Sequence, residues 1–148
     1  MILRKGQSKT DAATEAQAAL HGHFTAELLS DTGGLTQFGA FTETLAPGAR
    51  SGHRHWHEAE DEFLFMLDGE ATVVEDDGAH TLHPGDAACW PAGVPNAHHV
   101  ANRSDRPCTY LIVGTRAPSD RVHYAEVDQL YTRTNGTVTR TRRDGSPL

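Results

Sequence analysis

The chain has 148 residues, a formal net charge of -7 and 37% hydrophobic residues, which suits a single domain with one core. The acidic balance argues against nucleic acid or an anionic membrane as a partner, because both attract basic surfaces. No apolar run is long enough for a signal peptide or a transmembrane helix. We therefore expect a cytoplasmic protein.

The N-terminal residues predict at most one short helix. Residues 9–20 are rich in alanine, and Thr10 or Asp11 has a side chain suited to capping a helix before Gly22. We expect residues 1–23 to form a tail or this short helix.

From residue 24 onward, short strand-like runs alternate with turns rich in Gly, Pro, Asp and Asn, a pattern typical of an all-β sandwich or barrel. The runs cover residues 24–29, 35–45, 62–67, 70–75, 80–82, 87–90, 98–102 and 108–114. The dipeptide Asp68-Gly69 between two of them is a strong hairpin signal, so we expect neighbouring runs to pair as an antiparallel meander. Residues 24–116 are expected to form one barrel.

Histidines are concentrated in the segment 53–57, where His53, His55 and His57 occupy alternate positions. Alternate side chains of an extended strand share one face, so these three imidazoles point the same way. Glu62 follows at the start of an apolar run. Several neutral imidazoles and a carboxylate around one point are costly in a protein interior, but they suit a divalent transition metal.

The run that Glu62 opens predicts an inside and an outside for the barrel. If Glu62 faces inward, Leu64 and Met66 also face inward, and the outward positions are Phe63, Phe65 and Leu67. An apolar outer face is normally covered. We expect another sheet, the N-terminal strands or a second subunit to pack on it, and we expect a homodimer.

The last residues, 117–148, are expected to form a C-terminal extension of the barrel. Two strand-like runs flank Asn135-Gly136, which is a hairpin signal. Isolated hairpins are only marginally stable. This hairpin is therefore expected to pack on the barrel or on a partner chain.

Two motifs in the sequence resemble those of the cupin family. The first family motif reads Gly, about five residues, His-x-His, three or four residues, Glu, six residues, Gly. His55 and His57, then four residues, Glu62, six residues and Gly69 match it. Gly48 opens the motif with one residue more than the usual gap.

The second family motif reads Gly, five residues, Pro-x-Gly, two residues, His, three residues, Asn. Gly85 and the segment 91–93 match its first half, and His98 keeps the three-residue gap to Asn102. Four residues instead of two separate that segment from His98, and the usual histidine position falls on Asn96. Two alternatives follow: His98 after a longer turn, or Asn96, which leaves a site with two imidazoles and one carboxylate.

The resemblance implies an all-β cupin-type antiparallel barrel, the double-stranded β-helix or jelly roll, with N-terminal strands, an extended C-terminal tail and a metal near one mouth. It implies four ligands: His55, His57, Glu62 and His98, with Asn96 or His99 as the alternative to His98. His53 shares the parity of the ligands and is the alternative to His57. The ion is expected to be Fe, Mn, Ni or Zn.

Two further residues are candidates for proton transfer. We expect Tyr110 to act as an acid or to orient a substrate through its hydroxyl, and His53 to be available on the rim. No Ser-His-Asp order, P-loop or Gly-x-Gly-x-x-Gly motif is present. Nucleophilic hydrolysis and nucleotide binding therefore have no support in the sequence.

Three imidazoles and one carboxylate leave a divalent ion with about one net positive charge and one or two open positions. We therefore expect a metal-dependent enzyme that acts on a small, oxygen-chelating metabolite. The resemblance to the cupin family implies dioxygenase-type chemistry as the first hypothesis. The alternatives are a sugar or sugar-acid isomerase, a lyase, and a non-catalytic module that binds a small ligand or a metal.

Overall fold

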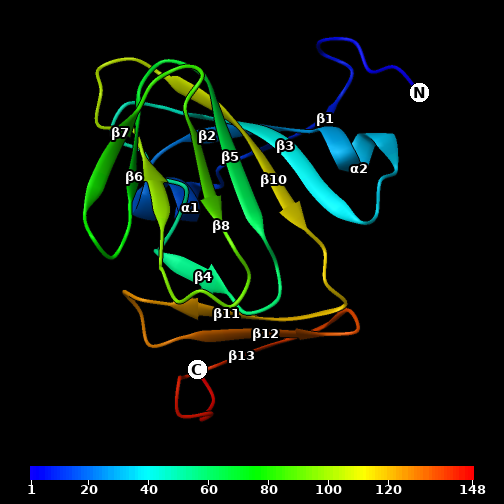
Figure 1. Cartoon of the computed structure of the whole chain (residues 1–148), viewed down its shortest axis with the longest axis vertical. Helices are drawn as coiled ribbons and strands as arrows, with labels where there is room; N and C mark the ends of the chain where they lie inside the picture. Colours follow the sequence, from blue (N-terminus) through cyan, green and yellow to red (C-terminus); the bar gives the residue numbers. More distant parts are fainter.

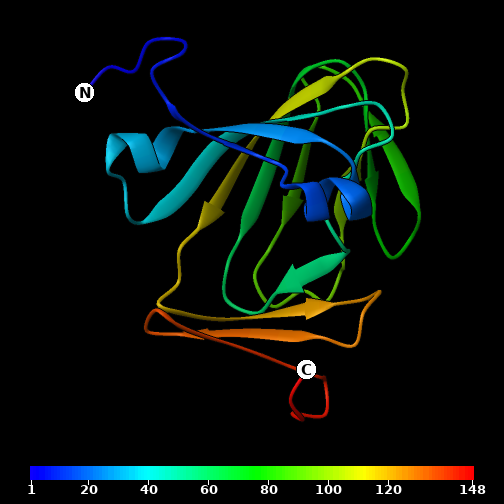
Figure 2. The same ribbon diagram turned by 180° about the vertical axis from the view of Figure 1, so that it is seen from behind.

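The computed structural model describes all 148 residues and contains thirteen β-strands and two short α-helices. Figures 1 and 2 show a barrel of strands, with the C-terminal strands lying across one end and the N-terminal strands and helices along one side. All strand pairs are antiparallel. The all-β fold that the turn pattern predicts is confirmed.

One layer of the barrel is a six-stranded sheet in the order β1-β2-β3-β10-β5-β8. Its strands are β1 (Lys9–Ala12), β2 (Phe24–Leu28), β3 (Phe38–Leu45), β5 (Glu62–Asp68), β8 (Ala87–Trp90) and β10 (Cys108–Thr115). Tyr110 on β10 is the register partner of Glu43 on β3 and of Met66 on β5. Directly opposed residues share a face, so these three side chains lie in one row.

The opposite layer contains a three-stranded sheet, β7-β6-β9, and a four-stranded sheet, β13-β12-β11-β4. The strands are β4 (His55–His57), β6 (Ala71–Val74), β7 (Ala79–Leu82), β9 (His99–Ala101), β11 (Ser119–Tyr124), β12 (Leu130–Thr134) and β13 (Thr137–Thr141). Single bridges between His55 and His98 and between Arg50 and Ala101 connect the two sheets. This layer therefore continues from β7 to the C-terminal strands.

The C-terminal hairpin forms as the Asn135-Gly136 signal predicts. β12 pairs with β13, and the two turn residues have φ of 48° and 83°, as tight hairpin turns of this type require. β12 also pairs with β11, and β11 pairs with β4. The hairpin is thus stabilised by the barrel layer, as Figure 1 shows for the orange and red strands.

The space between the two layers holds the hydrophobic core. Leu64 and Met66 on β5 are fully buried, as the alternation predicts. They belong to a cluster with Leu45, Ala49, Ala71, Val73, Trp90, Val100, Cys108 and Tyr110. Burying one large apolar side chain stabilises a fold by roughly 1.5–3 kcal/mol, so this cluster gives the barrel a rigid interior.

The outer face of β5 is open in the single chain. Phe63 is 37% exposed and Leu67 is 45% exposed. β1 and β2 pair beyond the edge of β3, and so they extend the sheet instead of covering this face. Cover by the N-terminal strands or by another sheet of the chain is therefore wrong for these two residues, and cover by a second subunit stays a prediction.

The predicted meander is wrong at its centre. β5 pairs with β10 and β8, whereas β6 pairs with β7 and β9. The chain at Asp68-Gly69 therefore crosses from one layer to the other. A Cβ atom at Gly69, where φ is 75°, would lie 2.6 Å from the carbonyl oxygen of Pro107. The crossing requires glycine at this motif position, because any side chain would collide with the neighbouring backbone.

The N-terminal helix starts later than the sequence predicts. The residues expected to open it form β1, and α1 (Glu15–His21) begins after Thr14. Thr14 and Gln17 form a capping box, which satisfies backbone groups at the helix start. The predicted caps at Thr10 and Asp11 are therefore wrong.

A second helix, α2 (Leu29–Gly33), joins β2 to β3 in place of the expected turn. It ends at Gly34, which has the left-handed conformation that commonly closes a helix. Neither helix combines the length and hydropathy needed to cross a membrane.

Candidate metal centre

Two of the predicted ligands are held opposite each other by the backbone. The amide of His55 donates to the carbonyl oxygen of His98 at 3.1 Å, and the amide of His98 donates back at 2.9 Å. Residues in such a directly opposed antiparallel pair place their side chains on the same face. The bridge next to β4 and β9 therefore sets the two imidazoles side by side, with ring centroids 5.4 Å apart.

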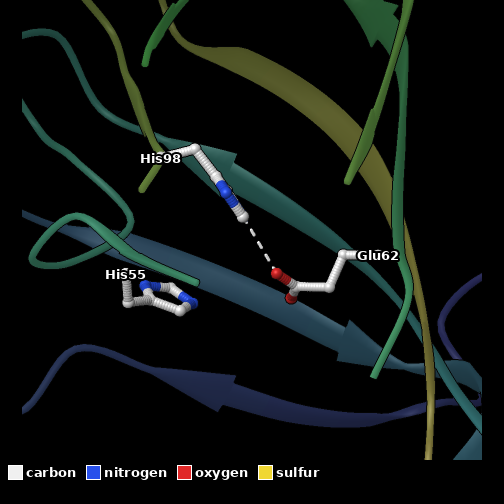
Figure 3. Close-up of side chains that lie close together, drawn as sticks. All are labelled: His55, Glu62 and His98. Atoms are coloured by element: carbon white, nitrogen blue, oxygen red, sulfur yellow. Dashed lines mark hydrogen bonds and ion pairs between the residues drawn. The ribbon is translucent and has the colours of Figure 1, made fainter. Parts of the chain in front are cut away.

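Glu62 reaches the same point from the opposite layer. Its Oε2 atom lies 2.9 Å from Nε2 of His98, and Figure 3 shows the side chains of His55, Glu62 and His98 pointing toward one another from separate segments. One ligand atom of each lies within 4.8 Å of the other two. Ligand atoms that share an ion at roughly 2.0–2.2 Å lie about 3–4 Å apart, so this spacing fits one ion.

The Nδ1 atoms of both bridge histidines already have backbone partners. Nδ1 of His55 lies 2.9 Å from the carbonyl oxygen of His53, and Nδ1 of His98 lies 3.1 Å from that of Asn96. A carbonyl oxygen can only accept a hydrogen bond, so each Nδ1 carries a proton. Each neutral imidazole therefore presents its Nε2 lone pair to the cluster.

The short contact between His98 and Glu62 requires a proton or a metal ion between the two atoms. Nε2 of His98 lies 2.9 Å from a carboxylate oxygen, and in the tautomer with the proton on Nδ1 this nitrogen is an acceptor. Two acceptors at this distance repel each other unless a proton or a metal ion lies between them. Imidazole nitrogen and carboxylate oxygen are ligands for Zn, Fe, Ni and Mn, so the residues present fit a divalent transition metal.

The protonation states of the cluster also favour binding of a metal. Burial has the largest effect on His55 and lowers its pKa, which keeps the imidazole neutral. Burial acts to raise the pKa of Glu62, but the contact with His98 and the neighbouring histidines outweigh it and lower that pKa. Metals bind neutral imidazole and ionised carboxylate, so both shifts favour the ligand forms.

His57 lies beside this cluster. Its Nε2 atom is 3.6 Å from Oε2 of Glu62, but by spacing it groups with Glu60 and Asp120 instead of with the other three predicted ligands. Nδ1 of His57 lies 2.6 Å from Oδ2 of Asp120. The structure therefore brings three of the four predicted ligands together and places His57 next to them.

A cavity of about 190 Å³ opens onto the cluster. Its wall combines the candidate ligands with polar and aromatic side chains: His55, Glu62, His98, Glu43, Tyr110, Trp90, His99 and Ser51, together with Phe41, Val100 and Ile112. Pockets for drug-sized ligands hold roughly 300–1,000 Å³. This cavity therefore suits a small metabolite.

Tyr110 and Glu43 form a hydrogen-bonded pair on the cavity wall. The Tyr110 hydroxyl donates to Oε1 of Glu43 at 2.6 Å. Burial raises the pKa of Glu43, and the hydrogen bond from Tyr110 opposes this rise without cancelling it. Burial also raises the pKa of Tyr110 well above its ordinary value, and the charge of Glu43 adds to the rise. Tyr110 is therefore a neutral donor, and Glu43 takes up a proton at a higher pH than an exposed carboxylate.

The remaining predicted residues take different places. The Asn96 side chain accepts a hydrogen bond from a backbone amide 3.2 Å away, and His98 is the residue that faces Glu62. His99 is buried and lines the cavity without joining the ligand cluster. His53 contacts Glu126 at 3.3 Å and lies outside the cavity wall.

Two residues near the site belong to neither sequence motif. On β3, Glu43 lies between two threonines and shares a face with Phe41 and Leu45. A carboxylate on an otherwise apolar strand face is the sequence signal that identifies it. Asp120 and Val122 are the buried positions of β11. Because one of these two buried positions is an aspartate, β11 lacks the alternation of apolar and polar residues from which strands are predicted.

The fold and the site define an antiparallel β-barrel with a histidine and carboxylate cluster inside. Residues 41–114, half of the chain, match the family model of the cupin domain. The chain belongs to the cupin family. No match is found among curated proteins.

Solved structures share this fold over most of the chain. A sugar phosphate isomerase of the cupin superfamily from Silicibacter pomeroyi is 37% identical, with a TM-score of 0.92 over 100% of this chain and 96% of that one. A protein provisionally described as a sugar phosphate isomerase, from Acidithiobacillus ferrooxidans, is 25% identical, with a TM-score of 0.79 over 85% and 80%. The polyketide cyclase RemF from Streptomyces resistomycificus, 23% identical with a TM-score of 0.68 over 86% of each chain, shares the fold alone.

Proposed function

We propose that this protein is a metal-dependent isomerase acting on a small hydroxycarbonyl compound of the sugar phosphate class. The observation that carries the proposal is the buried Glu43–Tyr110 pair on the wall of the cavity that also contains the ligand cluster. Moving a carbonyl group along a carbon chain needs a base beside a group that stabilises negative charge on oxygen. The likeness to the Silicibacter pomeroyi isomerase supports the same class.

Four residues would hold the ion in this proposal: His55, His57, Glu62 and His98. A bound Fe, Mn, Ni or Zn ion supplies a positive charge that polarises a substrate carbonyl group. Trp90 stacks on His98 with ring centroids 3.8 Å apart, and its indole N–H donates to Glu75 at 2.5 Å. This stack keeps the His98 ring in the plane that points Nε2 toward Glu62.

Glu43 is the group that we assign to proton transfer. As a carboxylate, it removes the proton from the carbon next to the carbonyl group. As a carboxyl, it returns that proton to the former carbonyl carbon, while one proton moves between the two substrate oxygens. The raised pKa of Glu43, caused by burial, makes it a stronger base than an exposed carboxylate.

Tyr110 remains in the site as the residue that orients Glu43. Its hydroxyl holds Oε1 and leaves Oε2 for the substrate. His53, which the sequence offers as a proton carrier, pairs with Glu126 outside the cavity wall. Dioxygenase chemistry is the first hypothesis from the sequence, and the likeness to the Silicibacter pomeroyi protein favours the isomerase alternative.

Two arginines that could serve a phosphorylated substrate, Arg50 and Arg54, lie outside the cavity wall on the side of His99. Arg50 and Arg54 approach the same carboxylate, Glu126, at 3.5 Å and 3.9 Å. Burial has the largest effect on the pKa of His99 in the cavity wall, followed by the charge of Glu126 and then by the charges of Arg50 and Arg54. Arginine is well suited to bind phosphate, and we propose that the phosphate end of the substrate takes the place of Glu126 beside these arginines.

The test uses metal-loaded protein with a panel of aldose and ketose phosphates and their unphosphorylated forms, followed by NMR in D₂O. We expect interconversion with deuterium entering the carbon next to the carbonyl group, and a preference for the phosphorylated forms. Glu43→Gln is expected to lower kcat by about 10²–10⁴-fold with the metal still bound. Glu27→Gln is the matched control, because Glu27 lies on neighbouring β2 opposite Thr42, on the other face of the sheet.

Two results would contradict the proposal. One is metal-loaded protein that neither isomerises nor exchanges deuterium with any compound of the panel, which would favour a binding module. The other is a Glu43→Gln variant with full activity, which would show that the pair is structural.

A further inference from the structure

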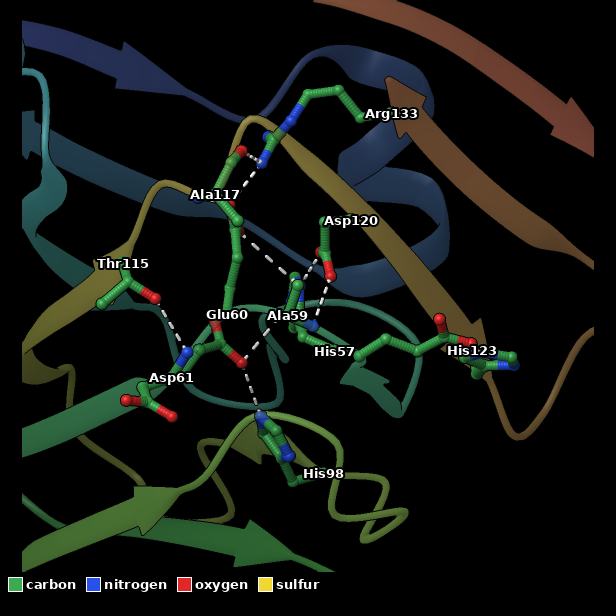
Figure 4. Close-up of polar contacts among 12 residues, drawn as sticks. His57, Ala59, Glu60, Asp61, His98, Thr115, Ala117, Asp120, His123 and Arg133 are labelled. Carbon is green, nitrogen blue, oxygen red and sulfur yellow. Dashed lines mark hydrogen bonds and ion pairs between the residues drawn. The ribbon is translucent and has the colours of Figure 1, made fainter. Parts of the chain in front are cut away.

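Asp120 connects the C-terminal strands to the candidate metal centre. Its Oδ2 atom lies 2.6 Å from Nδ1 of His57, and its Oδ1 atom accepts the backbone N–H of Ala59 at 2.9 Å. Asp120 is only 4% exposed, and burying a carboxylate is costly unless it is well paired. Figure 4 shows its side chain directed toward His57. Both carboxylate oxygens are therefore used at this one place.

β11 places Asp120 beside His57 because it pairs with β4, the strand that contains His57. Val122 is the register partner of His57, and the amide of Glu58 donates to the carbonyl oxygen of Arg121 at 3.0 Å. Asp120 and Val122 lie two residues apart and share one face of β11. The side chain of Asp120 is thus a diagonal neighbour of His57, within reach of its ring.

A second contact fastens the same segment. Glu60 forms an ion pair with Arg133 on β12 and accepts the amide of Ala117 at 2.8 Å, and Arg133 donates to the carbonyl oxygen of Ala117 at 3.0 Å. His57, Glu60 and Asp120 have the spacing of a metal site. Because these carboxylates already have protein partners, the group is better explained as a hydrogen-bond network that supports His57.

We propose that Asp120 is a positioning residue of the metal centre, which fixes His57 in the tautomer with the proton on Nδ1 and directs Nε2 toward Glu62. Without such a partner, a neutral imidazole divides between two tautomers. A carboxylate on one ring nitrogen also makes the other nitrogen a better ligand. The C-terminal residues 117–148 thereby become part of the ligand site, an inference that rests on the metal site of the proposed function.

Metal affinity measures this role. Metal-free, full-length Asp120→Ala and Asp120→Asn proteins are titrated with Zn²⁺ against a competing chelator. We expect affinity to fall by roughly 10–100-fold, the usual effect of losing a partner of a metal ligand. In a His57→Ala background the same changes are expected to cause no further loss, because Asp120 acts through His57.

The tautomer of His57 is measured without metal or substrate. Long-range ¹H–¹⁵N spectra above the imidazole titration range are expected to show the proton on Nδ1 in the unsubstituted protein, and a shift toward protonated Nε2 in Asp120→Ala. Asp120→Asn keeps the side-chain volume and stays informative if Asp120→Ala does not fold. Because neither metal nor turnover is needed, this result separates the role of Asp120 from the isomerase activity.

Arg133→Met is the matched control, since it loosens the same strands by removing the ion pair with Glu60 and leaves the contact between Asp120 and His57 in place. We expect it to lower Tm while leaving the His57 tautomer and the Zn²⁺ affinity unchanged. An equal loss of affinity in Arg133→Met and Asp120→Asn would assign Asp120 a purely structural role. A His57 tautomer that is the same with and without the Asp120 carboxylate would overturn the proposal.

Discussion

The candidate ligands fall into two groups that the fold holds in different ways. His55 and His98 are held by backbone, through their mutual hydrogen bonds and through carbonyl oxygens at both Nδ1 atoms. His57 is held by one side chain, Asp120, 63 residues further along the chain. Backbone contacts persist through most substitutions, whereas a side-chain contact is lost with one. The placement of two of the four ligands thus follows from the backbone, and that of a third, His57, depends on a single replaceable residue.

The largest effect is expected from the backbone-held half. His98→Ala removes the nitrogen that faces Glu62 and leaves this carboxylate without its partner. We expect a loss of metal affinity of more than about 100-fold, beyond the range for a partner of a ligand, measured as metal content after dialysis. His99→Ala is the matched control, because His99 is also buried but lies outside the cluster. Equal losses in both variants would mean that the wrong face of the segment has been assigned to the site.

Acid is expected to release the metal, because protons compete for the imidazole nitrogens. The unperturbed imidazole pKa is about 6.5, and burial lowers the pKa of His55, so His55 stays a ligand to lower pH than an exposed histidine. Metal content should therefore fall as the pH drops below about 6.5. Content that stays unchanged down to about pH 4 would contradict a site dominated by histidines.

A smaller effect on activity is expected from the contact between Tyr110 and the proposed catalytic base, Glu43. The hydrogen bond from Tyr110 acts to lower the pKa of Glu43, so Tyr110→Phe raises that pKa further. Since Glu43 must be ionised to accept a proton, the acid limb of the kcat/KM profile should move to higher pH, with a several-fold loss of rate near neutrality. An acid limb that stays in place or moves to lower pH would separate Tyr110 from the catalytic base.

The smallest effect is expected from the stack that supports His98. Trp90→Leu removes an aromatic contact worth about 0.5–1.5 kcal/mol, which corresponds to a loss of metal affinity of roughly 2–10-fold. Trp90→Phe keeps a ring against His98 but loses the hydrogen bond to Glu75. Its metal affinity should lie between those of Trp90→Leu and of the unsubstituted protein. Calorimetric titration measures both variants. A Trp90→Leu protein that binds metal as well as the unsubstituted one would show that the backbone alone orients His98.

The parts of the molecule that follow local rules are the parts that the sequence predicts. The alternation that buries Leu64 and Met66 depends only on the two-residue period of a strand. Asp68-Gly69, in contrast, predicts a turn but not which strands it connects. Pairing of β5 with β10 and β8 is decided by contacts distant in the sequence, and so the expected hairpin is a crossing between layers.

The site divides in the same way. Motif spacing predicts His55, His57, Glu62 and His98 as ligands, because each motif lies on one continuous segment of chain, and the structure brings three of these four together. Glu43 and Asp120 reach the site only through the sheet register, beside Tyr110 and His57 respectively. Each is a carboxylate on the inner face of a strand, where the sequence gives a parity but no partner. The residues that we assign to proton transfer and to the support of His57 therefore become visible only in three dimensions.

The most direct test of the account is anomalous diffraction from a crystal of the metal-loaded protein. One ion is expected, with Nε2 of His55, His57 and His98 and a carboxylate oxygen of Glu62 at roughly 2.0–2.2 Å, and with Asp120 still bonded to Nδ1 of His57. An ion bound through Nδ1, one that leaves His57 outside its coordination shell, or one located elsewhere on the chain would contradict it.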